Sequence, residues 1–133
     1  MSDRVMKGSL PPPMEAPVVR FEVLIAEQAK REAQRPDIQA EGEAALARLF
    51  KLASESDTSQ AGVLAAFLLG LYNGHRFRFD LTDLRRLDWW LHDDCMAVLR
   101  MDHVPQQEVH QYFERGQERF ERMARAWGKA NPE

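Results

Sequence analysis

The chain has 133 residues, of which 44% are hydrophobic and 29% are charged. This size and composition predict one globular domain that can bury a core without a metal ion or disulfides. The formal net charge of −3 excludes a general attraction to phosphate backbones, so nucleic-acid binding would need a local basic patch.

The N-terminal third predicts a tail followed by two helices. Residues 1–17 contain three consecutive prolines and few apolar groups, so we expect a flexible, proline-containing tail. Residues 18–34 show apolar positions at helical spacing, and Pro36 is expected to end or break this helix. A second helix is predicted from about residue 37 to residue 53.

The central segment predicts a buried helix closed by a turn. Asp57 or Thr58 can accept hydrogen bonds from the first turn of a helix at about 59–72, whose side chains are apolar on most sides. Asn73 and Gly74 supply the backbone conformation that ends a helix.

The second half predicts an extended connector and two further helices. Residues 76–81 alternate polar and apolar side chains, but without a second strand they are expected to be a connector that turns its two phenylalanines inward. Asp80 or Thr82 is expected to act as a structural cap for one continuous helix that extends to about Met101. A last helix is expected from Pro105 until Gly128 stops it.

These elements predict an all-α fold: a compact single-domain bundle of about five helices spanning residues 18–128, with residues 129–133 as a C-terminal tail. Six side chains on the clearest apolar faces should be nearly fully buried: Phe67, Leu68, Leu71, Leu84, Leu91 and Phe113.

The cysteine count and the lengths of the apolar stretches indicate in which compartment the chain acts and whether it contacts a membrane. Cys95 is the single cysteine and cannot form an internal disulfide, which fits a reducing compartment. The N-terminus lacks the apolar run of a signal peptide, and the longest apolar stretch, residues 63–72, is about half of the roughly 20 residues that a membrane span needs. We therefore expect a cytoplasmic chain that makes no membrane contact.

His92 and Cys95 are the residues best placed for metal binding or nucleophilic catalysis, because they lie three apart on a predicted helix beside Asp93 and Asp94. Their spacing matches no known metal motif, and nearby aspartates would raise the pKa of the thiol instead of lowering it. A buried structural cysteine explains the pattern better. We assign no catalytic residue, cofactor or metal, and keep an enzyme or metal site here as the third functional alternative.

The connector Arg76–Arg86 carries four arginines and two phenylalanines, a combination that can grip a phosphate backbone and stack on bases. Interspersed aspartates favour ion pairs within the chain instead. The last helix shows a similar mixture of charges, in which Glu118–Arg122 and Glu121–Arg125 have favourable spacing for ion pairs.

Trp89 and Trp90 are adjacent on a helix, so their side chains diverge by about 100° and both can be buried only if the helix is covered on several sides. We expect one of them to be exposed. An exposed tryptophan, extended by Arg85 and Arg86, would suit a protein partner or a homodimer contact.

The central block resembles an uncharacterised family of small proteins carried by proteobacterial integrative and conjugative elements and plasmids. The resemblance covers roughly residues 56–101 and depends most on Tyr72-Asn73 and on the Phe-Asp-Leu-Thr-Asp-Leu run at residues 79–84. Relatives in that family have more tryptophan and glycine around the connector than this chain has. The resemblance implies accessory cargo of mobile DNA and transfers no activity or catalytic residue.

We therefore predict a small, non-catalytic, helical protein-binding accessory factor of a mobile genetic element that modulates or counters a host function. The alternative is a nucleic-acid-associated factor that uses the Arg76–Arg86 connector.

Overall fold

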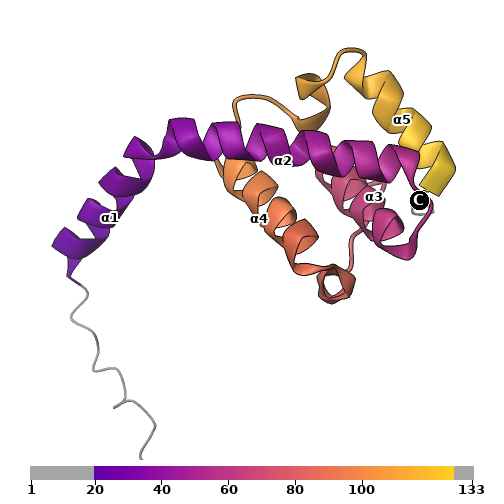
Figure 1. Ribbon diagram of the computed structural model, residues 1–133. Coiled ribbons are helices and arrows are strands. Elements are labelled where there is room, and N and C mark those ends of the chain that lie inside the picture. The colour runs from indigo at the N-terminus through magenta and orange to yellow at the C-terminus, as the bar shows by residue number, and fades with distance from the viewer. Residues whose placement is uncertain (1–19, 128–133) are drawn as a thin grey trace, which may run out of the picture. The chain divides into compact units, whose positions relative to one another are not determined.

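The computed structural model describes residues 20–127, and all regular elements in this part of the chain are helical (Figure 1). The fold class is therefore all-α, as predicted. By its internal contacts the chain divides into two compact units, Met1–Arg35 and Pro36–Glu133. The proline-containing tail, Gly128 and residues 129–133 lie outside the described residues.

The first unit contains helix α1 (Phe21–Ala33). The amide of Gln34 donates to the carbonyls of Lys30 and Arg31 and so closes the helix one residue before the predicted end. No residue of α1 is buried, and the apolar side chains of its first two turns are exposed. These side chains, Phe21, Val23, Leu24 and Ile25, contribute nothing to a core.

The first helix ends before Pro36, as predicted, and helix α2 (Arg35–Glu55) starts earlier than predicted, with Pro36 in its first turn. Proline suits that position because the first amides of a helix have no acceptor within the helix. Gly42 allows a close approach to helix α4 (Trp89–His103): a Cβ atom at this position would lie 2.3 Å from Cβ of Met101. The glycine in the middle of α2 is thus a packing feature.

Helix α3 (Ser59–Tyr72) forms the centre of the second unit. Its N-cap is Thr58, whose hydroxyl accepts from the amide of Ala61 at 3.1 Å. Leu64 and Leu68 are fully buried because helices or connectors surround this segment on most sides, in agreement with its nearly uniform apolar sequence. Helix α3 contacts α5 (Gly116–Trp127) and the short 3₁₀ helices η2 (Leu81–Arg86) and η3 (Val109–Tyr112).

The helix expected after Asp80 is not continuous. The chain forms the 3₁₀ helix η2 (Leu81–Arg86), becomes extended at Leu87 and Asp88, and then starts α4 (Trp89–His103). The amide of Asp88 donates to Oε1 of Gln60 on α3 at 2.8 Å, and this bond holds the break in place. Trp89 and Trp90 therefore lie at the first two positions of α4 and not in the middle of a helix.

The last predicted helix is also divided, into η3 (Val109–Tyr112) and α5 (Gly116–Trp127). Pro105 precedes both and starts neither. Arg115 has a φ of 55°, in the left-handed region, and this turns the chain into α5. Gly116 follows so closely beneath η3 that a Cβ atom would lie 1.6 Å from the carbonyl oxygen of His110.

Of the six predicted core residues, Phe67, Leu68 and Leu91 are buried. Leu71, Leu84 and Phe113 pack against the core but remain partly exposed, so the prediction was wrong for these three. Leu84 is displaced because it lies on η2 instead of on α4. The most deeply buried aromatic residue is Phe120 of α5, whose ring packs on those of Phe50 and Tyr72.

Candidate protein-binding surface

The connector between α3 and η2 is anchored at its start by polar contacts. The side chain of Asn73 accepts hydrogen bonds from the amides of His75 and Arg76, both at 3.1 Å. Arg76 in turn donates two hydrogen bonds to the carboxylate of Glu121 on α5, at 2.6 and 3.0 Å. Tyr72 donates its hydroxyl to the same carboxylate.

Two phenylalanines fix the rest of the connector, as the alternating sequence predicts. Phe77 is buried, and Phe79 is partly buried with its ring edge-on to that of Phe67, the centroids 5.6 Å apart. The connector therefore holds η2 at a defined place against α3.

Asp80 is the N-cap of η2 and accepts from the amide and the hydroxyl of Thr82 at 2.9 and 2.8 Å. These hydrogen bonds lower the pKa of the Asp80 carboxyl, with a smaller contribution from the charge of Arg85. The geometry is that of a cap, but its effect on stability remains a prediction. The capped element is η2 instead of the long helix expected.

Trp89 and Arg85 come together at a depression between η2 and α4. The depression has a volume of about 360 Å³ and is lined by Leu84, Arg85, Leu87, Trp89 and His92. The Trp89 side chain is 81% exposed, and its indole meets the ring of His92 edge-on at 6.0 Å. The site is small and mostly apolar, with one guanidinium at its rim, and therefore suits a single side chain of a partner more than a cofactor.

A second depression, of about 540 Å³, lies near the other end of η2. Its lining includes Leu81, which is 72% exposed, and Leu99 of α4, which is 37% exposed. On α4, residues Trp89, His92, Met96 and Leu99 follow at intervals of three and four and thus share one side of the helix. We call the exposed side chains of η2 and this side of α4 the η2–α4 surface.

Both tryptophans are exposed, whereas we expected only one, and Trp90 and Arg86 do not line the depression beside Trp89. Trp90 is 54% exposed and lies one turn before Asp94, whose carboxylate accepts two hydrogen bonds from Arg48 of α2, at 2.8 and 2.9 Å. Trp90 therefore belongs to the side of α4 that faces α2. Arg86 lies 3.6 Å from the carboxylate of Asp83 in an ion pair within η2.

His92 and Cys95 do not form a reactive pair. Cys95 is fully buried, and burial, with a smaller contribution from Asp94, raises the pKa of its thiol to about 12. A thiol with this pKa is not a nucleophile at neutral pH. Among the described residues no group of three or more histidine, cysteine, aspartate or glutamate side chains is placed to hold a metal ion.

The basic connector offers less charge than its sequence suggests. Arg76 is bound to Glu121, Arg86 pairs with Asp83, and the ring of Phe77 is buried beneath the guanidinium of Arg76, 4.7 Å from its centroid. Arg78 and Arg85 remain exposed. Two separate arginines do not make the continuous basic, aromatic groove that single-stranded nucleic acids require.

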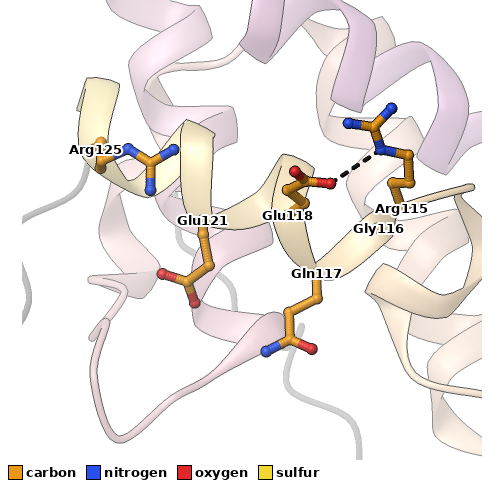
Figure 2. A pocket seen from close by; sticks show the side chains of 6 residues that line it. All are labelled: Arg115, Gly116, Gln117, Glu118, Glu121 and Arg125. Atoms are coloured by element: carbon orange, nitrogen blue, oxygen red, sulfur yellow. Dashed lines mark hydrogen bonds and ion pairs between the residues drawn. The ribbon is translucent and has the colours of Figure 1, made fainter.

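A further depression, of about 590 Å³, lies beside the first turns of α5 (Figure 2). Its lining is polar, and Arg115 and Glu118 are joined there by a 3.0 Å hydrogen bond. The pairs expected along α5 are replaced: Glu118 pairs with Arg115, and Glu121 with Arg76. Arg115, Glu118 and Glu121 of its lining are therefore already engaged by partners within the chain.

Sequence reasoning placed Trp89 and Arg85 at the site but missed Leu81, Met96 and Leu99. The signal for Met96 and Leu99 was available, since their spacing from Trp89 is helical. Leu81 could not be found in the same way, because its exposure depends on the 3₁₀ geometry of η2 and on where the connector ends.

Among the described residues, no helix combines the length and apolar character needed to cross a membrane. No curated protein and no solved structure has significant similarity to the chain. A family model does match residues 43–128, more than half of the chain, and this segment contains α3 to α5 together with the whole η2–α4 surface. The chain therefore belongs to DUF7673, a family of unknown function.

Proposed function

We propose that this is a small, non-catalytic protein-binding factor whose contact site is the η2–α4 surface. The observation that carries the proposal is the exposure of Trp89, 81%, at the edge of a preformed apolar depression with Arg85 at its rim. Tryptophan and arginine are the side chains most enriched among residues that dominate binding energy. Exposed apolar side chains gathered in one place are typical of interaction sites.

The rigidity of the surface supports the same function. Leu84 and Leu87 pack against the core, and the connector before η2 is fixed by Phe77, Phe79 and the Arg76–Glu121 pair. A partner would therefore meet a formed surface and need not order it, which reduces the entropy lost on binding.

The genetic setting suggested by the family resemblance indicates what kind of partner this surface would bind. The resemblance to proteins of integrative and conjugative elements suggests accessory cargo of mobile DNA, so the partner would be a protein of the element or of its host. The single buried thiol fits action in a reducing, cytoplasmic compartment.

The two alternatives have less support. A nucleic-acid role would have to use Arg78 and Arg85 alone, and an enzyme would have to use a thiol that is buried and protonated. Neither arrangement provides the chemistry that its function needs.

Site-specific photo-crosslinking tests the proposed function. A photo-reactive amino acid at position 89 should give a discrete protein adduct in cells of the source organism. The matched control is position 51, where the Lys51 side chain on α2 is 73% exposed. The Arg85→Glu substitution should reduce the yield from position 89, because it reverses the charge at the rim.

Adducts of equal yield and pattern from positions 89 and 51, or no adduct from position 89, would contradict the proposal. The circular dichroism spectrum and melting temperature of each variant should match those of the unmodified protein, because changes at exposed sites usually alter stability by within about 0.5 kcal/mol.

A further inference from the structure

The outward side of α4 carries opposite charges at equivalent distances from its middle. Positions 93 and 100 are equidistant from the midpoint between Met96 and Ala97, with Asp93 on one side and Arg100 on the other. Positions 89 and 104 are likewise equidistant, and both are apolar and exposed: Trp89 at 81% and Val104 at 40%. With about 100° per residue, Trp89, Asp93, Met96 and Arg100 point within a sector of about 60° of the helix, and Val104 is the C-cap that follows its last turn.

The two charges are not used within the chain. The Asp93 side chain is 75% exposed, and Nδ1 of His92 lies 4.0 Å from its carboxylate. Arg100 is exposed and makes no hydrogen bond or ion pair in the described part of the chain. Asp93 and Arg100 cannot pair with each other, because seven residues of helix separate them by about 10 Å.

A surface that binds a copy of itself about a twofold axis must place each charge opposite its counterpart after a rotation of 180°. An antiparallel pair of α4 helices with the axis near Met96 satisfies this condition. Asp93 of each copy would face Arg100 of the other copy, and Trp89 would pack on Val104 of the other copy. A uniformly acidic or basic partner would instead meet repulsion at one of the two positions.

We propose that the partner of this surface is a second copy of the chain, bound antiparallel along α4 in a symmetric homodimer. The inference rests on the proposed function, because it names the occupant of the Trp89–Met96 part of the η2–α4 surface and extends that contact to Asp93 and Arg100. Trp89 supplies the large apolar contact, and the two Asp93–Arg100 pairs set the direction and register of the helices.

Charge reversal tests the proposal on the purified full-length protein, with mass measured by light scattering and affinity by analytical ultracentrifugation. Wild type should be a dimer. Asp93→Arg alone and Arg100→Asp alone should each be monomeric, because each variant places like charges opposite one another twice. An equimolar mixture of the two variants should form a heterodimer, since both facing pairs are then of opposite sign.

Tryptophan substitutions give a second readout. Trp89→Ala should raise the dimer dissociation constant at least about 30-fold, the factor expected of a dominant interface residue. Trp90→Ala, which truncates an exposed indole on another side of α4, should leave it unchanged. All variants should keep the helical circular dichroism spectrum of wild type.

Three results would overturn the homodimer: a monomeric wild type at all concentrations, a dimer that survives both single charge reversals, or variants whose mixture remains monomeric. Survival of the charge reversals would assign self-association to another face, such as the apolar side chains of α1. A monomer that still gives a crosslink to a different protein from position 89 would refute the homodimer and leave the proposed function standing.

Discussion

Glu121 joins three segments that are distant in sequence. Its carboxylate accepts hydrogen bonds from Arg76 of the connector and from Tyr72 at the end of α3, while its own backbone belongs to α5. The hydrogen bonds from Arg76 and then Tyr72 lower the pKa of Glu121 to about 2. Burial and the bond to Glu121 raise the pKa of Tyr72 to about 12. The cluster fixes the connector that positions η2.

Glu121→Gln should therefore lower the free energy of unfolding at neutral pH by about 1–2 kcal/mol, as expected for charge-assisted hydrogen bonds that remain partly open to solvent. A carboxyl with a depressed folded pKa stabilises the fold above its unfolded pKa, and that contribution disappears as pH falls through the folded pKa. The difference between wild type and Glu121→Gln should thus close between pH 4.5 and about 2.

Urea denaturation of both proteins across this pH range measures the effect. Glu118→Gln is the matched control, because Glu118 pairs with Arg115 on an exposed turn. A Glu121→Gln difference that stays constant from pH 7 to 2 would show that the carboxylate charge does not stabilise the fold.

At the scale of elements, the chain is divided by short breaks where one helix meets another. The break at Leu87 and Asp88 separates η2 from α4 and leaves Trp89 at a helix start, where α4 itself covers only one side of the indole. The break at Arg115 lets η3 and α5 cross closely at His110 and Gly116. Both breaks redirect side chains that a continuous helix would have placed elsewhere.

Gly116→Ala should lower the free energy of unfolding by about 3 kcal/mol, because the added methyl group would overlap the carbonyl oxygen of His110 and the backbone would have to shift. Thermal or urea denaturation provides the measurement. Arg115→Gly is the matched control and should preserve or slightly raise stability, because glycine adopts the positive φ of this position without strain. Equal stability of Gly116→Ala and wild type would mean that η3 does not lie so close to α5.

For the molecule as a whole, the sequence was sufficient to predict the fold class and the helices whose apolar faces are continuous. The apolar character of α3 and the alternating residues around Phe77 and Phe79 were sufficient to predict the buried helix and the inward phenylalanines, because burial alone determines both. The sequence did not predict that each of the two later helices is divided into a 3₁₀ helix and an α-helix. The breaks within these helices depend on contacts between segments distant in sequence, such as the hydrogen bond from the amide of Asp88 to Gln60. Local periodicity in the sequence does not indicate such contacts.

The candidate site was predicted in part for the same reason. Helix geometry separated Trp89 from Trp90, but which indole would meet Arg85 depended on the place of η2. The ion pairs of Arg76 and Arg86 depended likewise on tertiary structure or on the tight turn of η2.

The contrast between the two units gives a prediction for the whole chain. Phe67→Ala should lower the free energy of unfolding by about 3–5 kcal/mol, because the side chain is only 5% exposed and its loss leaves a cavity beside Phe79. Phe21→Ala removes the same group from α1, where Phe21 is 70% exposed, and should change stability by less than about 0.5 kcal/mol. Equal losses in urea denaturation would assign Phe21 to the folded core.

The buried position of Cys95 makes its thiol a probe of the rare unfolding events that expose it to solvent. A single thiol at the centre of α4, fully buried and protonated, can meet a labelling reagent only when the packing around it separates. The rate at which the thiol is labelled in native buffer then measures how often this packing opens, just as amide hydrogen exchange does for the backbone. A ligand or second subunit that stabilises α4 would lower this labelling rate. Thiol labelling of the wild-type protein therefore reports both the lifetime of the native state and the binding of a partner.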